Sequence, residues 1–235
     1  MSARITLACL DMAGTTVTDD GAVEEAFGAA LVAGGTDPSG PAGEAAAIYI
    51  RDTMGQSKLD VFKALFHGDA VLVAAANKCF EETYALTIAA GEVRPIPGAL
   101  EAIRRLRNHG IKVCLTTGFS SGTRDALIDM LGWGGEIDLA VSPADCGRGR
   151  PFPDMILRAL MLLEIDEVAA VAVVGDTASD LVAGRRAGAG VVAGVLTGAH
   201  NRAELEAVPP THILGSVAQL PGLLLGAHVG VALDG

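Results

Sequence analysis

The chain has 235 residues, of which 50% are hydrophobic, and its formal net charge of -11 gives a pI near 4.8. This length holds one ordinary domain plus a smaller one. The acidic balance argues against nucleic-acid and membrane partners, because either needs a basic surface field. No apolar run approaches the roughly 18 residues of a spanning helix, and the N-terminal apolar stretch ends too early for a signal peptide, so we expect a cytoplasmic protein.

The first predicted element is a short buried strand whose apolar run begins near Ile5 and ends on Asp11. Open α/β sheets bind their ligands at the carboxyl ends of their strands, which makes Asp11 a candidate nucleophile. The alternative is an aspartate that only caps the following turn.

Four helical patterns follow, with no strand-like run between them. They cover residues 23–31, 44–51, 58–66 and 69–86. Turn-rich stretches flank them at 18–21 and 91–97, where glycine and proline break helices. We therefore predict an all-helical cap domain over residues 19–94, inserted between core segments 1–18 and 95–235.

Beyond residue 97 the pattern alternates between helix and strand. Helices are expected at 98–108, 122–131, 154–163, 180–187 and 217–224, and strands at 111–116, 139–141, 168–174, 190–195 and 211–214. Such alternation implies a parallel sheet covered by helices on both faces. The predicted fold class is α/β, with a doubly wound, Rossmann-like core and a helical cap inserted after strand one.

The cap contains one lysine of special interest, Lys58. Ser57 and Asp60 match a capping box, which places Lys58 at the first helical position, beside the positive end of the helix dipole. A cation is disfavoured there, so we expect a lowered pKa and a free amine available for Schiff-base chemistry. Taken alone, the local sequence favours an ordinary surface lysine.

Two further segments can hold a phosphoryl group. The strand at 111–116 leads into Thr116, Thr117 and Gly118, which offer hydroxyl and N–H groups to an anion. In a later Pro-rich loop, the forked guanidinium of Arg150 can hold two phosphoryl oxygens. The alternatives are an ordinary strand end and a solvated arginine.

A metal site is predicted at the end of the strand at 168–174. Asp176 and Asp180 lie four residues apart and can both face a hard cation such as Mg²⁺. Helix capping by Thr177 or Ser179 would explain one of the two acids. Among the histidines, only His200 lies just past a strand end where it could approach this site.

These motifs, in this order, resemble those of the haloacid dehalogenase (HAD) superfamily, in which an aspartate attacks phosphorus or carbon and water regenerates it. The resemblance implies the catalytic residues Asp11, Thr117 and Arg150, with Thr116 as the alternate for Thr117. It also implies Mg²⁺ held by Asp11, Asp176, Asp180 and the carbonyl of Ala13.

Within the superfamily the chain looks like the phosphonatases. Asp11 is followed by Met12, Ala13, Gly14 and Thr15, and Ala13 occupies the position where most phosphatases of the superfamily carry a second acid. That acid protonates a leaving alkoxide, so a chain with alanine there must handle its leaving group differently.

The phosphonatase resemblance also covers the cap, where Met54, Gly55 and Lys58 match a motif whose lysine forms an imine with the substrate aldehyde. It implies a catalytic Lys58 and a substrate-binding set of Gly14, Thr15, Met54, Gly55 and Gly118. Two positions depart from the pattern. Phe119 replaces a tyrosine, and Val61 replaces a histidine; His67 is about 13 Å farther along the helix than Lys58.

The predicted function is a Mg²⁺-dependent HAD hydrolase that cleaves the phosphorus–carbon bond of phosphonoacetaldehyde or a similar carbonyl phosphonate, through an aspartyl-phosphate and a Lys58 Schiff base. One alternative is a phosphate monoester hydrolase of the phosphoglycolate phosphatase type, in which Lys58 only binds an anion; Ala13 argues against it and Val61 for it. The other is a non-catalytic protein that binds a phosphorylated ligand. The expected partner is a small anionic phosphonate or phosphate, and a possible homodimer stays open.

Overall fold

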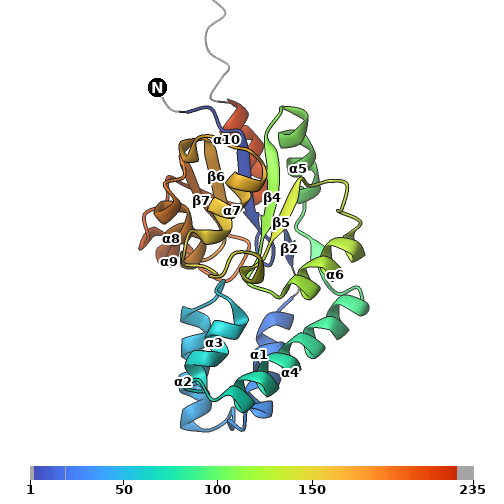
Figure 1. The fold of residues 1–235 in the computed structure, drawn as a ribbon, viewed down its shortest axis with the longest axis vertical. Coiled ribbons are helices and arrows are strands. Elements are labelled where there is room, and N and C mark those ends of the chain that lie inside the picture. The colour runs from blue at the N-terminus through green and yellow to red at the C-terminus, as the bar shows by residue number, and fades with distance from the viewer. Residues whose placement is uncertain (1–2, 19, 227–235) are drawn as a thin grey trace, which may run out of the picture.

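The computed structural model describes residues 3–18 and 20–226. Its centre is a six-stranded sheet in which every neighbouring pair is parallel (Figure 1). The strands lie in the order β5 (Leu139–Val141), β4 (Lys112–Thr116), β1 (Leu7–Asp11), β6 (Val171–Gly175), β7 (Val191–Val195) and β8 (His212–Leu214). This arrangement confirms the predicted α/β fold class.

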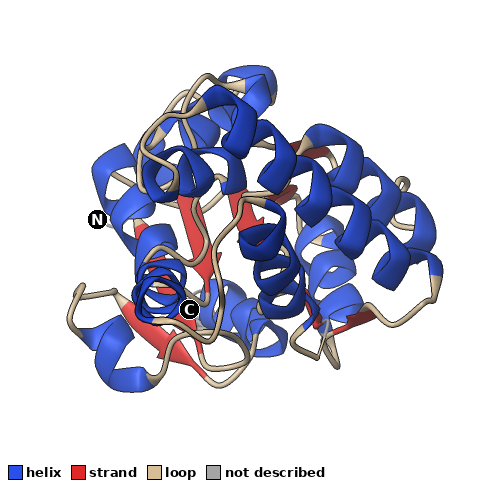
Figure 2. Ribbon diagram, turned by 90° about the horizontal axis from the view of Figure 1, so that it is seen from below, coloured by secondary structure: helices blue, strands red, loops and turns tan. Residues whose placement is uncertain are grey.

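The sheet is covered by helices on both faces (Figure 2). They are α5 (Ala99–Asn108), α6 (Ser121–Leu131), α7 (Asp154–Leu162), α8 (Ala178–Ala187), α9 (Arg202–Glu206) and α10 (Leu220–Gly226). Strand β1 shows the two faces residue by residue: Ala8 and Leu10 belong to one buried cluster, and Leu7 and Cys9 to another. Because successive side chains of a strand point to opposite faces, a strand buried on both sides reads as one continuous apolar run.

The helical insert lies at the carboxyl end of the sheet, below the core in Figure 1. Its helices are α1 (Ala22–Ala33), α2 (Pro41–Asp52), α3 (Lys58–Leu65) and α4 (Ala70–Ala89), which we call the cap helices. Their core contains the rings of Phe27, Phe62 and Phe80, with centroids 4.9 to 6.0 Å apart. The proposed domain limits include residues 1–2, 19 and 227–235, which lie outside the described residues.

A short antiparallel pair, which the sequence did not predict, closes the base of the insert. Strand β2 (Val17–Thr18) pairs with β3 (Arg94–Pro95) in place of the expected turns. Each strand has only two residues, too few for any periodicity to appear in the sequence. The chain therefore leaves and re-enters the core at one place.

Other boundaries differ from expectation for local reasons. Helix α8 begins at Ala178, before the predicted 180, because Thr177 caps it. Strand β6 begins at Val171, because residues Val168–Ala170 form a 3-10 turn. Within the described ranges, no helix has both the length and the apolar character needed to cross a bilayer.

Candidate active site

The candidate nucleophile lies at the centre of the sheet's carboxyl edge. Asp11 is the last residue of β1, whose neighbours are β4 on one side and β6 on the other. Thr117 directly follows β4, and Asp176 directly follows β6. Parallel strands end at the same edge, so the sheet brings these three side chains together, as expected for the ligand-binding edge of an open α/β sheet.

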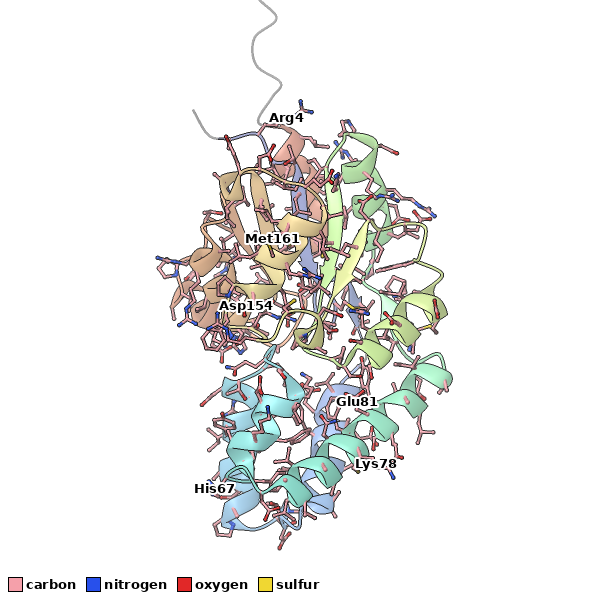
Figure 3. All side chains as sticks on the ribbon, viewed as in Figure 1. Arg4, His67, Lys78, Glu81, Asp154 and Met161 are labelled. Atoms are coloured by element: carbon pink, nitrogen blue, oxygen red, sulfur yellow. The ribbon has the colours of Figure 1, made fainter. Side chains whose placement is uncertain are left out.

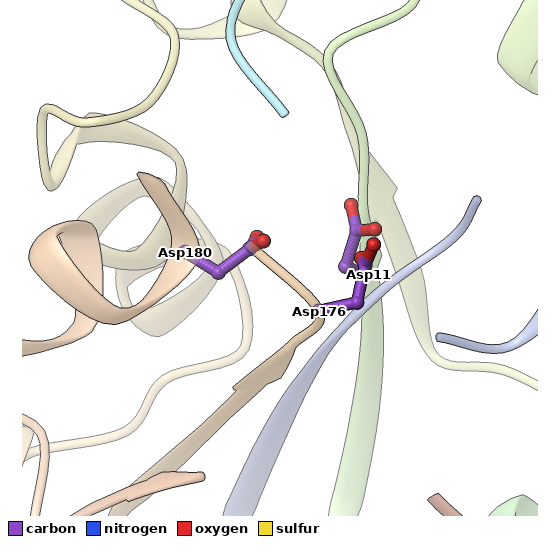
Figure 4. A group of neighbouring side chains, drawn as sticks. All are labelled: Asp11, Asp176 and Asp180. Carbon is purple, nitrogen blue, oxygen red and sulfur yellow. The ribbon is translucent and has the colours of Figure 1, made fainter. Parts of the chain in front are cut away.

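Three buried carboxylates form the deepest part of this edge. Asp11, Asp176 and Asp180 each offer an oxygen within 4.8 Å of the others, and their exposed fractions are only 5%, 2% and 2% (Figure 4). Carboxylate oxygens are the ligands that Mg²⁺ and other hard cations prefer. The set of donor atoms therefore fits the predicted metal.

Asp180 belongs to the acid cluster and also forms the helix cap that was its alternative interpretation. Its Oδ2 accepts bonds from the backbone N–H of Thr177 at 3.1 Å and from the Thr177 hydroxyl at 2.5 Å, which completes a capping box at the start of α8. Its Oδ1 is contacted by Arg150. Capping by one oxygen thus orients the other toward the site.

Asp176 is fixed by two donors from distant parts of the chain. Its Oδ1 accepts from the Thr15 hydroxyl at 3.2 Å, and its Oδ2 accepts from the backbone N–H of Ala199 at 2.7 Å. His200, next to Ala199, is buried, and its Nδ1 accepts from the backbone N–H of Ala178 at 3.0 Å. The loop after β7 therefore supports the acid cluster through its backbone, while the His200 ring faces the start of α8.

Arg150 is the cation of the core side. It is buried, and its Nη1 donates to Asp11 Oδ1 at 2.6 Å and to Asp180 Oδ1. Its buried Nε has no hydrogen-bond partner among the described residues. Arg148, in contrast, is exposed and pairs with Asp154 on the outside of the core, labelled in Figure 3. Arg150 is thus held against the acid cluster and away from solvent.

Charge is unbalanced in this cluster. Burial, reinforced by Asp180 and Asp176, raises the pKa of Asp11 well above its usual range, although Arg150 acts in the opposite direction. Burial and Asp180 raise the pKa of Asp176 to about 6. Burial lowers the pKa of Arg150, but Asp11 and Asp180 raise it by more, so this side chain stays charged. Three carboxylates face one guanidinium, and a divalent cation would offset the excess negative charge.

Lys58 is the cation of the cap side. It is the first residue of α3, is only 6% exposed, and its Nζ lies 5.1, 5.8 and 5.4 Å from the ring centroids of Phe27, Phe80 and Phe119. A cation over aromatic faces is attracted by their negative charge distribution. The surface-lysine interpretation of Lys58 is therefore wrong.

The helix start that carries Lys58 differs in one detail from the sequence prediction. The Ser57 hydroxyl accepts from the Asp60 N–H at 3.4 Å, but the Asp60 carboxylate pairs with Lys63 at 3.0 Å, so no reciprocal capping box forms. Val61 is buried in the cap core, and His67 lies past the end of α3 at the far end of the cap (Figure 3). As predicted, no histidine side chain lies beside Lys58 on α3: Val61 occupies that position, and His67 is too far along the chain to take its place.

A cavity of about 230 Å³ lies between the core and the cap helices. Its core lining includes Asp11, Ala13, Gly14, Thr117, Gly118, Arg150 and Asp176, and its cap lining includes Met54, Gly55 and Lys58. Thr117 lines it, whereas the hydroxyl of Thr116, the alternate, donates to the Leu10 carbonyl at 3.5 Å. Thr15 and Asp180 do not line it, because Thr15 is bonded to Asp176, and Asp180 to Thr177 and Arg150.

Two glycines let the cap approach the core this closely. Gly55 has φ +83°, and a Cβ built on it would overlap the Thr177 hydroxyl. A Cβ on Gly118 would overlap the Gln56 carbonyl, and the Gly118 carbonyl accepts from the backbone N–H of Lys58 at 3.3 Å. The cap therefore contacts the core directly at these two glycines, and the contact at Gly118 holds the backbone of Lys58 beside the cavity.

Comparison with known proteins identifies the family. The family model for haloacid dehalogenase-like hydrolases matches residues 5–188. The chain belongs to this family. Solved HAD-type structures share its fold: a hydrolase from Pseudomonas syringae aligns with a TM-score of 0.79 at 22% identity over 93% of this chain and 97% of that one. A phosphonoacetaldehyde hydrolase-like protein from Oleispira antarctica gives 0.73 at 24% over 96% and 93%.

Curated relatives narrow the similarity within the HAD-like hydrolases. The chain is 32% identical over 162 residues to the phosphonoacetaldehyde hydrolase of Bordetella pertussis, covering 59% of each chain. It is 34% identical over 139 residues to that of Syntrophobacter fumaroxidans, covering 57% of this chain and 50% of the relative. The matches thus span only about half the length of these relatives. A solved structure described as a phosphoglycolate phosphatase, from Lactobacillus delbrueckii, has a TM-score of 0.73 at 20% identity over 95% of this chain and 100% of that one.

Several residues of this HAD site were missed in the sequence. Phe27 and Phe80 approach Lys58 from α1 and α4, and no local pattern connects three helices that distant in the chain. Asp20 and Glu24 line the cavity near the start of α1, where they read as ordinary acids at a helix N-terminus. Ala199 acts through its backbone N–H, which no side-chain motif reveals.

Proposed function

We propose that this HAD-like hydrolase is Mg²⁺-dependent and cleaves the carbon–phosphorus bond of phosphonoacetaldehyde or a similar carbonyl phosphonate. One observation carries the proposal: Lys58 and Asp11 line the same cavity. Ala13 lines it too and offers no acid there. An amine can form an imine with a carbonyl, and a carboxylate can attack phosphorus. A substrate with both groups uses both residues.

The first step belongs to the cap. The Lys58 amine condenses with the carbonyl carbon and, with one proton taken up from solvent, releases water, which gives a protonated imine. The rings of Phe27, Phe80 and Phe119 favour a cation at this nitrogen, and the protonated imine is such a cation. The imine then accepts the electron pair of the carbon–phosphorus bond as that bond breaks. No alkoxide leaves, so the reaction needs no acid at Ala13.

The second step belongs to the core. An Asp11 oxygen forms a bond to phosphorus as the carbon departs, and water later hydrolyses the aspartyl-phosphate. Arg150 and the Thr117 hydroxyl would hold phosphoryl oxygens, and both residues line the cavity. Asp11, Asp176, Asp180 and the Ala13 carbonyl would hold Mg²⁺, which when bound offsets phosphoryl charge. Gly14, Met54, Gly55 and Gly118 would complete the substrate site, and Thr15 would act only through its hydrogen bond to Asp176.

A second candidate function is phosphate monoester hydrolysis. Val61, in place of a histidine beside the lysine, favours it, and so do Asp20 and Glu24, whose carboxylates line the cavity. Either acid is chemically able to protonate a leaving alkoxide. In this case Lys58 would only bind an anion.

Borohydride trapping decides between the two functions. Wild-type protein is mixed with phosphonoacetaldehyde, reduced, and weighed intact. We expect one stable adduct and loss of activity, with no adduct on Lys58→Arg. Lys63→Arg is the matched control, because Lys63 lies on the same helix and is exposed; it should be trapped like the wild type. An unchanged wild-type mass with full activity would favour the esterase.

A further inference from the structure

The cap helices contain a second cavity, of about 360 Å³, between α1 and α2. Most of its lining is apolar, with the buried side chains of Phe27, Leu31 and Ile50 among it, and its two charged lining residues are Glu24 and Arg51. It shares Glu24, Met54 and Ala199 with the active-site cavity. The two cavities are therefore neighbours with a common boundary.

Phe27 connects this second cavity to the reacting amine. Its ring lies 5.1 Å from Lys58 Nζ and also lines the second cavity. A group attached to the carbonyl carbon that Lys58 attacks would thus be separated from the second cavity only by the Phe27 side chain. The second cavity therefore adjoins the carbonyl end of the proposed substrate.

Gly28 keeps part of this cavity open. It lies inside α1, where glycine is a poor helix former, and a Cβ built on it meets no heavy atom within 4 Å. Gly43, on the facing helix α2, is different, because a Cβ there would overlap the backbone of Asp37 and Pro38. Packing explains the glycine at 43 but not the one at 28, where the missing side chain adds only volume.

We propose that the second cavity binds the apolar substituent of a substrate larger than phosphonoacetaldehyde, namely an uncharged 2-oxoalkylphosphonate, R–CO–CH₂–PO₃²⁻, with an aliphatic R. The inference rests on the proposed function and names its substrate class. The active-site cavity has the volume of about eight waters, and the second adds that of about twelve. Glu24 and Arg51 have opposite charges, so the aliphatic R is inferred from the apolar part of the lining.

The reaction balances as it does for the aldehyde. Imine formation with the ketone releases one water, and the carbon–phosphorus electron pair passes to the carbon as an enamine while the Asp11–phosphorus bond forms. The enamine takes a proton from water, and hydrolysis of the imine gives R–CO–CH₃ and free Lys58. A further water releases phosphate from Asp11, so one water is consumed overall.

Chain length tests the inference. Phosphate release is measured with wild-type protein and Mg²⁺ for phosphonoacetaldehyde, for 2-oxopropylphosphonate (R methyl) and for 2-oxoheptylphosphonate (R pentyl). Each added methylene that enters an apolar site should raise kcat/KM about threefold to fourfold, so the pentyl-to-methyl ratio should reach roughly 100. A carboxylate R, as in 3-phosphonopyruvate, should show none of this increase over methyl, because it places no methylene against the apolar lining.

Filling the cavity should remove this preference. Gly28→Leu and Ala47→Leu project into it from opposite walls, and each should lower the pentyl-to-methyl ratio to near one; the ratio itself is insensitive to the fraction of folded protein. Ala47 is exposed on α2, so that variant folds even where Gly28→Leu does not. Gly222→Leu is the matched control, because its Cβ also meets no atom but lies on α10 in the core.

The outcomes separate the two levels of the proposal. If the aldehyde and the methyl ketone are cleaved but the wild-type ratio is near one, or neither filling variant changes it, the inference is wrong and the proposed function stands. If no carbonyl phosphonate of any length is cleaved, the proposed function is wrong and the inference falls with it.

Discussion

The two sides of the active-site cavity are built on opposite principles. On the core side, Asp11, Asp176, Asp180 and Arg150 are buried against one another, and each charge depends on the others. On the cap side, Lys58 is surrounded by the aromatic rings of three separate segments. The core side is suited to an anion and a metal, whereas the cap side suits a carbonyl and its carbon chain.

This difference indicates that phosphoryl chemistry depends on the core side and that selectivity among substrates depends on the cap side. A phosphoryl group presents the same oxygens whatever it is attached to, so a charged core side serves any phosphoryl compound. In the proposed binding mode, the carbon skeleton lies toward the cap side. Changes in the core should therefore affect every substrate alike, and changes in the cap should affect substrates unequally.

Asp11→Asn should give the largest effect, and the same one for every substrate. The amide keeps the shape of the side chain but is no nucleophile, so we expect kcat to fall about 10⁴-fold or more with both phosphonoacetaldehyde and p-nitrophenyl phosphate. Phosphate release measures the loss, and circular dichroism checks the fold. Retention of either activity near the wild-type level would place the nucleophile elsewhere.

Lys58→Arg should separate the two kinds of substrate. Arginine keeps the charge and cannot form an imine, so cleavage of phosphonoacetaldehyde should fall about 1000-fold while ester hydrolysis changes little. The two rates are compared on one protein preparation. Retention of both activities near the wild-type level would mean that Lys58 acts through its charge alone.

Gly118→Ala should disturb the contact between the two sides. The added methyl meets the Gln56 carbonyl, so the cap must move away from Asp11, and we expect kcat/KM to fall about 30-fold. Gly122→Ala is the matched control, because the nearest atom to its Cβ, the Ser120 hydroxyl, lies 3.8 Å away. Similar activities of the two variants would show that this contact does not position the site.

The pH dependence of metal binding should show the smallest effect that is specific to the core. Excess EDTA should abolish activity, and Mg²⁺ should restore it. A proton competes with Mg²⁺ for Asp176, whose pKa is raised to about 6 by burial and Asp180, so the apparent Mg²⁺ affinity should be about tenfold weaker at pH 5 than at pH 8. Titration calorimetry measures this; a flat profile would contradict it.

The same pKa shift fixes a sign for stability. A carboxyl whose pKa is raised on folding binds its proton more tightly in the folded chain, so its contribution to stability falls as the pH rises from about 4 to 6. Without metal, Asp176→Asn should therefore melt higher than wild type at pH 8, with a smaller difference at pH 4. Thermal melts at the two pH values provide the comparison.

The core side could be predicted from the sequence because its residues directly follow buried strands. Asp11 ends an apolar run, and Asp176 follows another, so the topology of a parallel sheet brings them to one edge. Local patterns predicted contacts less reliably where one side chain has two possible partners. Asp60 was expected to complete a capping box, but it pairs with Lys63 three residues on, a contact that the same spacing allows.

The cap side could be predicted only in part. Lys58 was placed at a helix start by its own neighbours, but the rings around it come from α1, α4 and the end of β4. Such a cluster depends on how helices pack, which periodicity within one helix does not determine. Helix α9 was missed for a different reason: its five residues are too few to show a helical period.

The pairing of β2 with β3 has a consequence for how enzymes of this kind change over evolutionary time. Val17 pairs with Pro95 and Thr18 with Arg94, so the two crossings between core and cap share one anchor. Everything between them can lengthen, shorten or be exchanged without displacing a strand that carries Asp11 or Asp176. A lineage can therefore acquire a new substrate by rewriting a single continuous stretch of its gene, while the phosphoryl chemistry is inherited unchanged.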